Sequence, residues 1–486
     1  ELCELNQEMN QKELVSMTVE QMLKPCFYTA LTTIIAFASL GVSEIKPVID
    51  FGRMMVAGIF FAFIFAFTLV PAVMVSLFSR DSESKDFSKG ITLVFSNFTT
   101  NNAKVVIGVA LSLIVLSYVG ISKLTVENRF IDYFKSSTEI YRGMELLDQK
   151  LGGTAPLDIV LNAPNDWSVE EEEFDDDFGF EENVDSINGY WWNTISISRL
   201  EEVHDYIESL PEIGKVLSVA SGIKVARELN DGEELSELDL ALVKNMLPED
   251  IKESLLSSYI SEDENQVRIS ARVLESSYGL NRNELLEEIS MTLEKEYGFS
   301  DQEYRLTGLA VLYNNMLQSL FTSQILTLGL VFIAITAMLI VLFQSLSLAL
   351  IGITPNLMAA LFVLGGMGIA GIPLDMMTIT IAAISIGIGV DNTIHYIHRY
   401  KREFAIDQDY IASMHRSHAS IGRAMYYTSI TIIFGFSILA LSNFKPSIYF
   451  GLLTGLAMLS ALLGSLLLLP RLLLLFQPIG KTSLRL

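Results

Sequence analysis

Cysteine is nearly missing from this chain, which has only Cys3 and Cys26. The long stretch 122–319 contains none, so it holds no disulfides, which is compatible with a periplasm-facing position. The phosphate-binding motif GxxxxGK[ST] is absent as well, and this excludes a P-loop ATPase. We predict neither a metal site nor a cofactor.

Basic residues are also few, at 33 Lys and Arg against 57 Asp and Glu, which gives a net charge of −24. The deficit lies in one place, because residues 121–320 hold 16 basic and 42 acidic residues. The remainder of the chain is therefore almost neutral. An acidic domain of this kind repels phosphates and argues against nucleic-acid partners.

Apolar residues are abundant and make up 50% of the chain. They form runs of about 20 residues, the length that crosses a bilayer as a helix. The sequence predicts a polytopic α-helical membrane protein with an inserted acidic domain. The first residue is not Met, and we expect the true start upstream. The eight predicted spans are 25–43, 51–78, 103–121, 320–343, 346–370, 374–398, 423–443 and 447–476.

Lysine and arginine gather in alternate short loops, which the positive-inside rule places in the cytoplasm. The loop between the sixth and seventh spans, for example, holds Arg399, Lys401, Arg402, Arg416 and Arg423. Alternation then places the acidic domain outside. The predicted segments are 1–24 (cytoplasmic, amphipathic), 25–78 (two spans), 79–102 (cytoplasmic linker), 103–121 (one span), 122–319 (external α/β domain), 320–476 (five spans) and 477–486 (cytoplasmic tail).

The first two spans and the last two match without gaps at an offset of 399. Residues 24–71 share 15 identities in 48 positions with residues 423–470, including the turn dipeptides Lys46-Pro47 and Lys445-Pro446. Repeats of this kind build secondary transporters, whose working site lies between the halves. The offset places Glu1 opposite Tyr400. We therefore expect an N-terminal half of the same polypeptide, with four more spans and a second acidic helix; an eight-span protein is the alternative.

Helical and alternating patterns follow one another through the acidic domain, which predicts one or two split β-α-β units. The loop 165–193 contains a run of acidic residues at 170–177 and then Tyr190, Trp191 and Trp192. We predict a mobile loop and aromatic packing there. The alternatives are cation binding by the acidic run and contact of the aromatic residues with lipid head groups or a hydrophobic ligand. The predicted helices are 138–151, 198–210, 250–259 and 281–297, and the predicted strands are 157–162, 214–219, 266–274 and 304–308.

Asp391 lies inside one of the most apolar runs of the chain. A charge at the centre of a membrane helix costs about 2.5–3.5 kcal/mol on insertion scales, so such a residue is a functional candidate by default. His395 and His398 follow at i+4 and i+7 on the same helix face. Since histidine titrates near physiological pH, the three side chains form a candidate proton relay. A structural hydrogen bond for Asp391 and an interfacial anchor for His398 are the alternatives.

The seventh span offers hydroxyl groups to this carboxylate. We predict that Thr428 and Thr431 face Asp391, with Tyr427 as a weaker candidate.

Small and helix-breaking residues mark places where the membrane helices pack or bend. Gly387 and Gly389 precede Asp391 and allow close helix approach. Pro355 removes a backbone hydrogen bond and kinks its span, where Asn356 is placed to satisfy the freed carbonyl. The glycine-rich end of this span, 365–371, predicts packing or a hinge.

The stretch from Gly387 to His395, Gly-Ile-Gly-Val-Asp-Asn-Thr-Ile-His, resembles the GxGVDxxIH motif of the RND superfamily, in its MmpL-like and Patched-like branch of hydrophobe exporters. The order of spans also resembles spans 5 to 12 of such a protein. The resemblance implies a porter-like periplasmic domain and a proton-relay role for Asp391. Many MmpL-like members have Tyr where this chain has Asn392, so the hydrogen-bond network around it can differ.

The hypothesis is a proton-driven exporter of hydrophobic or lipidic molecules in a bacterial inner membrane, and not an enzyme. Its expected partners are membrane lipids and a hydrophobic substrate; a periplasmic partner and a homo-oligomer are left open. The alternatives are a lipid-sensing receptor of Patched or sterol-sensing type and a translocation accessory resembling SecD/SecF.

Overall fold

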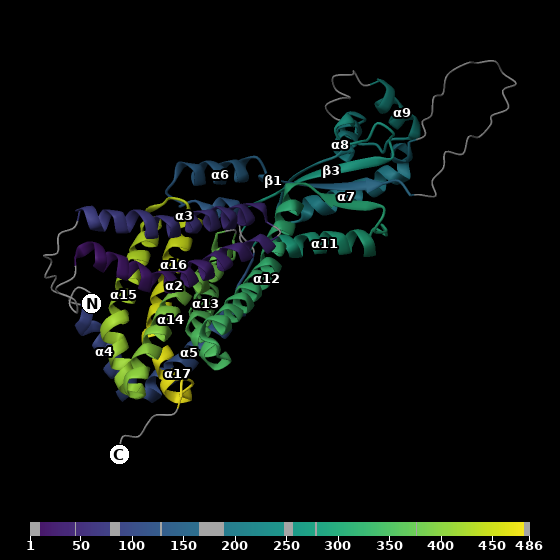
Figure 1. Ribbon diagram of the computed structural model, residues 1–486. Coiled ribbons are helices and arrows are strands. Elements are labelled where there is room, and N and C mark those ends of the chain that lie inside the picture. Colours follow the sequence, from purple (N-terminus) through teal and green to yellow (C-terminus); the bar gives the residue numbers. More distant parts are fainter. Residues whose placement is uncertain are drawn as a thin grey trace, which may run out of the picture. The chain divides into compact units, whose positions relative to one another are not determined.

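The computed structural model describes residues 10–43, 45–77, 88–126, 129–164, 189–246, 256–277, 279–375 and 377–480. The chain divides into two compact units, one formed by 1–128 with 317–486 and the other by 129–316. Figure 1 labels their elements. The first unit is the helical bundle, and the second contains the sheet.

Long apolar helices form the first unit, as their composition predicts. Seven of the described helices are long and apolar enough to cross a membrane. An eighth long helix, α14, is not among the seven, although its 30 residues suffice in length. Polar side chains from Asp391 onward dilute its apolar character. The helices are α2 (Gln11–Ala38), α3 (Lys46–Leu77), α4 (Ser88–Asn101), α5 (Ala103–Ile121), α12 (Leu309–Phe343), α13 (Leu346–Ala370), α14 (Thr378–Asp407), α15 (Tyr410–Ser437), α16 (Lys445–Leu463) and α17 (Leu469–Phe476).

Two predicted segment boundaries differ from the helices. The segment predicted to precede the first span belongs to α2 from Gln11 onward. The predicted linker 79–102 contains α4, a helix that the sequence analysis did not anticipate. α4 packs against α15 and against the π-helical turn η6 (Gly464–Leu468) that joins α16 to α17.

The same local structure recurs at the offset of 399. The helix α2 is followed by the 3₁₀ turn η1 (Ser39–Val42), and α15 is followed by η5 (Ile438–Leu441). After the first turn, Ser43 Oγ accepts the N–H of Ile45 at 3.2 Å; after the second, Ser442 Oγ accepts the N–H of Phe444 at 3.0 Å. The elements α2, η1 and α3 begin 399 positions before α15, η5 and α16, respectively.

The glycines of the two groups are equivalent too. A Cβ added at Gly52 would collide with the carbonyl oxygen of Phe37, and one at Gly451 with that of Phe436. The rings of Phe37 and Phe51 lie 6.0 Å apart, and those of Phe436 and Phe450 lie 5.7 Å apart. Glycine lets each helix pair approach to backbone contact at its turn.

Four antiparallel strands form the sheet of the second unit, in the order β2-β3-β1-β4. Apart from the two described helices inserted between β2 and β3, the chain order is strand, helix, strand, strand, helix, strand, which is one split β-α-β unit of ferredoxin-like topology. All four predicted strands and three of the four predicted helices are confirmed; the fourth, 250–259, lies mostly outside the described residues. The elements are β1 (Ala155–Asn162), α7 (Thr194–Ser209), β2 (Ile213–Leu217), β3 (Gln266–Val273), α11 (Arg282–Lys295) and β4 (Tyr304–Thr307), with α6 (Glu139–Lys150), α8 (Val219–Leu229) and α9 (Glu237–Met246) beside them.

The core of this unit lies between the sheet and the helices α7 and α11. Alternate residues of β1 are fully buried, and Trp191 and Trp192 of the short turn η3 (Tyr190–Trp192) pack into the same core at 1% and 3% exposure. The two tryptophans are therefore packing residues, and contact with lipid is not their role in this structure. The acidic run 170–177 lies outside the described residues.

Candidate functional site

The Asp391 carboxylate lies on a half-buried stripe of α14 inside the helical unit. Ile388, Asp391, His395 and His398 recur every three or four residues, and their side chains are half-buried or, at His398, exposed. Neighbouring positions on the other faces are buried. The structure thus confirms that Asp391, His395 and His398 share one helix face. Exposed His398 also fits the anchor interpretation.

A threonine of α2 contacts Asp391. Thr32 is fully buried, and its Oγ1 lies 3.4 Å from Asp391 Oδ1, within reach for donating a hydrogen bond. The same hydroxyl lies 2.7 Å from the carbonyl oxygen of Thr29 and 3.2 Å from that of Tyr28. A donor shared among three acceptors holds each of them weakly. The carboxylate therefore has a partner that it can gain or lose with its charge.

The prediction that Thr428 and Thr431 face Asp391 is wrong. Both side chains are exposed and donate to carbonyl oxygens of their own helix, those of Met425 and Tyr427. The Tyr427 side chain is likewise outward, with 51% exposed. The residue of α15 that faces α14 is Ser429, which follows Thr428 directly. Its hydroxyl lies in the interface between the two helices.

Asn392 follows Asp391 and lies on the adjacent, buried face of α14. Its Nδ2 donates to Ser429 Oγ at 3.2 Å. Further along the same face, Tyr396 OH lies 3.0 Å from His418 Nδ1, and His418 Nε2 lies 2.9 Å from the carbonyl oxygen of Leu466 in η6. The sequence analysis did not identify Tyr396 and His418, although Tyr396 follows Asn392 by one helical turn.

An ion-pair cluster closes this face at the end of α14. Arg416 of α15 donates to Glu403 at 2.7 Å and to Asp407 at 2.9 Å, and Arg399 reaches the other oxygen of Glu403 at 2.7 Å. Bidentate contacts of this kind fix geometry as well as charge. The helices α14 and α15 are thus tied together by polar contacts from Asn392 to Asp407.

The glycines before Asp391 serve close packing, as predicted. A Cβ at Gly387 would collide with the Cβ of Ala36 in α2. At Gly389 it would lie 2.6 Å from Oδ1 of Asn356 in α13. Both neighbours are buried, so neither has room to withdraw. These two glycines bring α2 and α13 against the helix that carries Asp391.

Asn356 links the kinked helix α13 to α14. Its Nδ2 donates to the carbonyl oxygen of Gly352 at 3.2 Å and to Thr393 Oγ1 at 3.0 Å. Pro355 has no N–H and therefore leaves the carbonyl of Ile351 without its usual donor. We predicted that Asn356 would bond to this carbonyl, but it bonds to the next one, that of Gly352. Pro355 itself packs against Gly464 of η6.

The glycine-rich end of α13 packs against α5. Any Cβ at Gly365 or Gly368 would collide with the backbone of Ser117 or Gly120. This is a backbone-to-backbone helix crossing of the small-residue type. The predicted packing role is confirmed at these two positions, while Gly366 has open space around it.

One cluster in the second unit brings possible metal ligands together. Ligand atoms of His204, Asp205 and Glu208 lie within 4.8 Å of one another on α7. The ammonium of Lys224 contacts the Asp205 carboxylate and lies 3.8 Å from that of Glu208. His204 Nδ1 is 2.9 Å from Ser218 Oγ. A lysine thus already supplies the positive charge, and a metal is not needed to balance the carboxylates.

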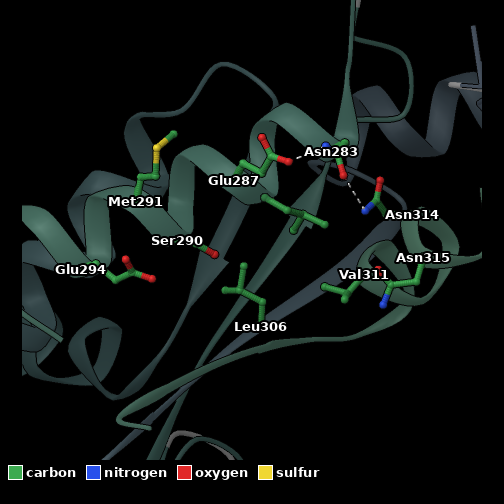
Figure 2. Close-up of a pocket in the computed structure, with 10 residues that line it drawn as sticks. Asn283, Glu287, Ser290, Met291, Glu294, Leu306, Val311, Asn314 and Asn315 are labelled. Carbon is green, nitrogen blue, oxygen red and sulfur yellow. Dashed lines mark hydrogen bonds between the residues drawn. The ribbon is translucent and has the colours of Figure 1, made fainter. Parts of the chain in front are cut away.

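The second unit also holds an open cleft of about 440 Å³ between α11, β4 and the start of α12. Figure 2 shows Glu287 and Glu294 on its α11 wall, with Leu306 and Val311 on the opposite side. Asn314 Nδ2 donates to Asn283 Oδ1 at 3.3 Å, and Asn283 donates to Glu287 at 2.7 Å. The cleft is open to solvent, with acidic side chains along one wall and apolar side chains opposite.

Comparison with known families decides the class of the chain. The model of the MMPL family matches residues 4–95 and 204–483, which is most of the chain. This chain belongs to the MMPL family. The MMPL-like resemblance that the GxGVD motif indicated is therefore confirmed, and so is the helical fold with an inserted α/β domain.

Two further likenesses agree with this MMPL assignment. A Methanocaldococcus jannaschii protein described as a membrane protein, MJ1562, is 24% identical over 244 residues, which are 50% of this chain and 62% of that protein. The cryo-EM structure of the hedgehog release protein Disp from the water bear Hypsibius dujardini aligns with a TM-score of 0.59 at 14% identity, over 96% of this chain and 60% of that one. The MMPL chain thus spans about three fifths of each, and the likeness to Disp shows the fold.

Proposed function

We propose that this MMPL-family protein exports hydrophobic or lipidic molecules and is driven by protons that bind at Asp391. The observation that carries the proposal is the position of this carboxylate, on a half-buried stripe of an otherwise apolar helix with the hydroxyl of Thr32 beside it. An intramembrane carboxylate is costly, and proton relays are one of its established uses.

Protonation at Asp391 changes the contact with α2. The ionised carboxylate only accepts hydrogen bonds, whereas the protonated one also donates. The hydroxyl of Thr32 can donate to a backbone carbonyl of its own helix, so its oxygen is able to accept from the protonated carboxyl. Protonation then removes the charge from the contact between α2 and α14 and reverses the direction of its hydrogen bond, which changes how the two helices pack.

Movement of α14 carries α15 with it in this mechanism. The two helices are joined by Asn392 and Ser429 near Asp391 and by Arg416, Glu403 and Asp407 at their ends. One charge crossing 100 mV supplies about 2.3 kcal/mol. That is enough to shift the balance between two packings that differ by a few kcal/mol.

A second repeat completes the relay in this proposal. Thr32 and Thr431 are equivalent at the offset of 399, and Thr431 is exposed. We propose that Thr431 faces an acidic helix in the N-terminal half of the same polypeptide, as Thr32 faces Asp391. The stripe of Asp391, His395 and His398 then lies between the halves, where secondary transporters place their coupling sites.

The proposal places the protein in a bacterial inner membrane, with residues 122–319 in the periplasm. The distribution of lysine and arginine supports this orientation. The external domain passes the hydrophobic molecule outward, and it is the part that a periplasmic partner or a second copy of the chain would contact.

Export driven by a proton gradient tests the function. Full-length protein is reconstituted in vesicles with a fluorescent lipid analogue, and outward transport is measured with and without an imposed pH gradient. We expect Asp391→Asn to abolish the gradient-dependent part, while Asp50→Asn, a change at the exposed ion pair with Arg53 on α3, leaves gradient dependence in place. Equal transport by wild type and Asp391→Asn would contradict the relay.

The same assay separates the alternatives. A receptor of the lipid-sensing type predicts lipid binding that is indifferent to the gradient. An accessory of protein translocation predicts gradient-dependent release of a secreted polypeptide with no transport of the lipid analogue.

A further inference from the structure

An apolar groove of about 360 Å³ lies along α5, α13 and α16, within the helical unit. Sixteen residues line it, and Ser460 is the one polar residue among them. Part of the lining is buried, as at Val106 and Ala110, and part faces outward, as at Val109 with 53% exposed. The groove is therefore a half-open channel on a membrane-spanning surface, separate from the stripe that carries Asp391.

The length of the groove matches that of a single hydrocarbon chain. The lining residues run from Val105 to Leu113 on α5 and from Leu456 to Leu468 on α16 and η6, which is about 12 and 18 Å at ~1.5 Å per residue. One leaflet of hydrocarbon is about 15 Å deep, half of the ~30 Å core. The groove is therefore about as long as one leaflet is deep, which is the length of one acyl chain.

Positive charge stands at one end of the groove. Lys104 precedes Val105 and is exposed, and Arg471 follows Leu468 by one helical turn. The Nε atom of Arg471 is buried without a hydrogen-bond partner among the described residues. The two lie at the same end because α4, which directly precedes α5, packs against η6 and α17. Long basic side chains reach an interface while their stems cover apolar surface.

We propose that this groove binds one acyl chain of an anionic membrane phospholipid, whose phosphate is held by Lys104 and Arg471. The apolar lining matches the chain, and the two cations match the head group. The site does not depend on the export function proposed above, since it follows from the groove and its rim.

The bound chain lies against the helix that supports the Asp391 region. Met358 and Ala359 of α13 line the groove. One turn earlier, Pro355 contacts Gly464 of η6, and the adjacent Asn356 bonds to Thr393 of α14. Occupancy of the groove therefore supports the kinked segment of α13 from one side, while α14 contacts it from the other.

Photo-crosslinking tests the site directly. Full-length protein in vesicles is exposed to phosphatidylglycerol carrying a diazirine in one acyl chain, and labelled residues are mapped by mass spectrometry. Unlabelled phosphatidylglycerol and phosphatidylcholine with the same chains serve as the two competitors. We expect labels to concentrate on the groove lining and anionic lipid to be preferred.

Matched variants sharpen the test. Val109→Trp fills the groove, whereas Leu111→Trp lies two residues away on the same helix with a similar exposure, 58% against 53%, and does not line it. Leu459→Trp fills the groove from α16. We expect Val109→Trp and Leu459→Trp to remove the groove labels and Leu111→Trp to keep them. Lys104→Gln and Arg471→Gln should each reduce the preference for anionic lipid about fivefold.

Three results would overturn the proposal. Labels spread evenly over the exposed apolar surface would mean that no groove site exists. Equal labelling by Val109→Trp and Leu111→Trp would place the lipid elsewhere. Equal competition by the two head groups in the wild-type protein would remove the role of Lys104 and Arg471.

Discussion

The contact between Gly387 and Ala36 provides the sharpest test of the packing around Asp391. A methyl group at Gly387 would overlap the methyl group of Ala36, which is 1% exposed. Overpacking of a close contact costs about 1–3 kcal/mol. We therefore expect Gly387→Ala to lower the free energy of unfolding by that amount, and to lower transport because α2 and Thr32 are pushed away from Asp391.

The reciprocal change identifies the cause. Ala36→Gly removes the opposing methyl group, so the double variant again has one methyl group in the contact. We expect it to recover stability to within about 1 kcal/mol of the wild type, since exchanging Gly and Ala within helices changes stability by about 0.5–1 kcal/mol.

Thermal unfolding in detergent measures these differences, with Gly366→Ala as the control. Gly366 is also helical but has open space around it, so alanine there should be neutral or stabilising by about 0.5–1 kcal/mol. If Gly387→Ala and Gly366→Ala behave alike, or if Ala36→Gly fails to rescue Gly387→Ala, the account of the α2–α14 contact is refuted.

Two further predictions concern the second unit. Arg282, 1% exposed, pairs with Glu275 at 2.5 Å, so Arg282→Met should cost about 3–5 kcal/mol in unfolding free energy by stranding a buried charge. Arg268 is 44% exposed and reaches Asp158 only at 3.9 Å, so Arg268→Met should cost under about 1 kcal/mol, and similar losses in the two variants would contradict this. Burial, and then the charge of Lys224, lower the pKa of His204 below 6.5, so the folded domain resists a proton that the unfolded chain accepts. Stability should therefore fall as the pH drops below 6.5, seen as faster hydrogen exchange in α7, and His204→Gln should flatten this dependence.

The local patterns predicted most of the second unit. Alternating apolar residues placed all four strands, because one face of each strand must be buried. The alternation of strands and helices predicted one or two split β-α-β units, and the described residues contain one, with the strand order β2-β3-β1-β4. The aromatic turn at Tyr190–Trp192 was correctly predicted as packing, for burial of large rings is the commonest outcome.

The candidate site residues on α14 were predicted correctly, but their partners on the neighbouring helices were not. The spacing of Asp391, His395 and His398 sets their common face because helical periodicity is regular. The rotation of α15 about its axis is decided by packing, so Thr428 and Thr431 were chosen where Ser429 lies in the contact. The repeat contained the signal for Thr32, which is the equivalent of Thr431 at the offset of 399. Thr431 was preferred to Thr32 because it lies closer to Asp391 in the sequence.

The protonation state of Asp391 during transport is the most direct test of the account. Infrared difference spectroscopy of the reconstituted protein follows the carbonyl band of a protonated carboxyl group when the hydrophobic substrate is added or the pH gradient is imposed. The account predicts a band that appears with the driving force and is missing from Asp391→Asn. A spectrum that is the same in wild type and Asp391→Asn, together with intact gradient-driven export, would contradict it.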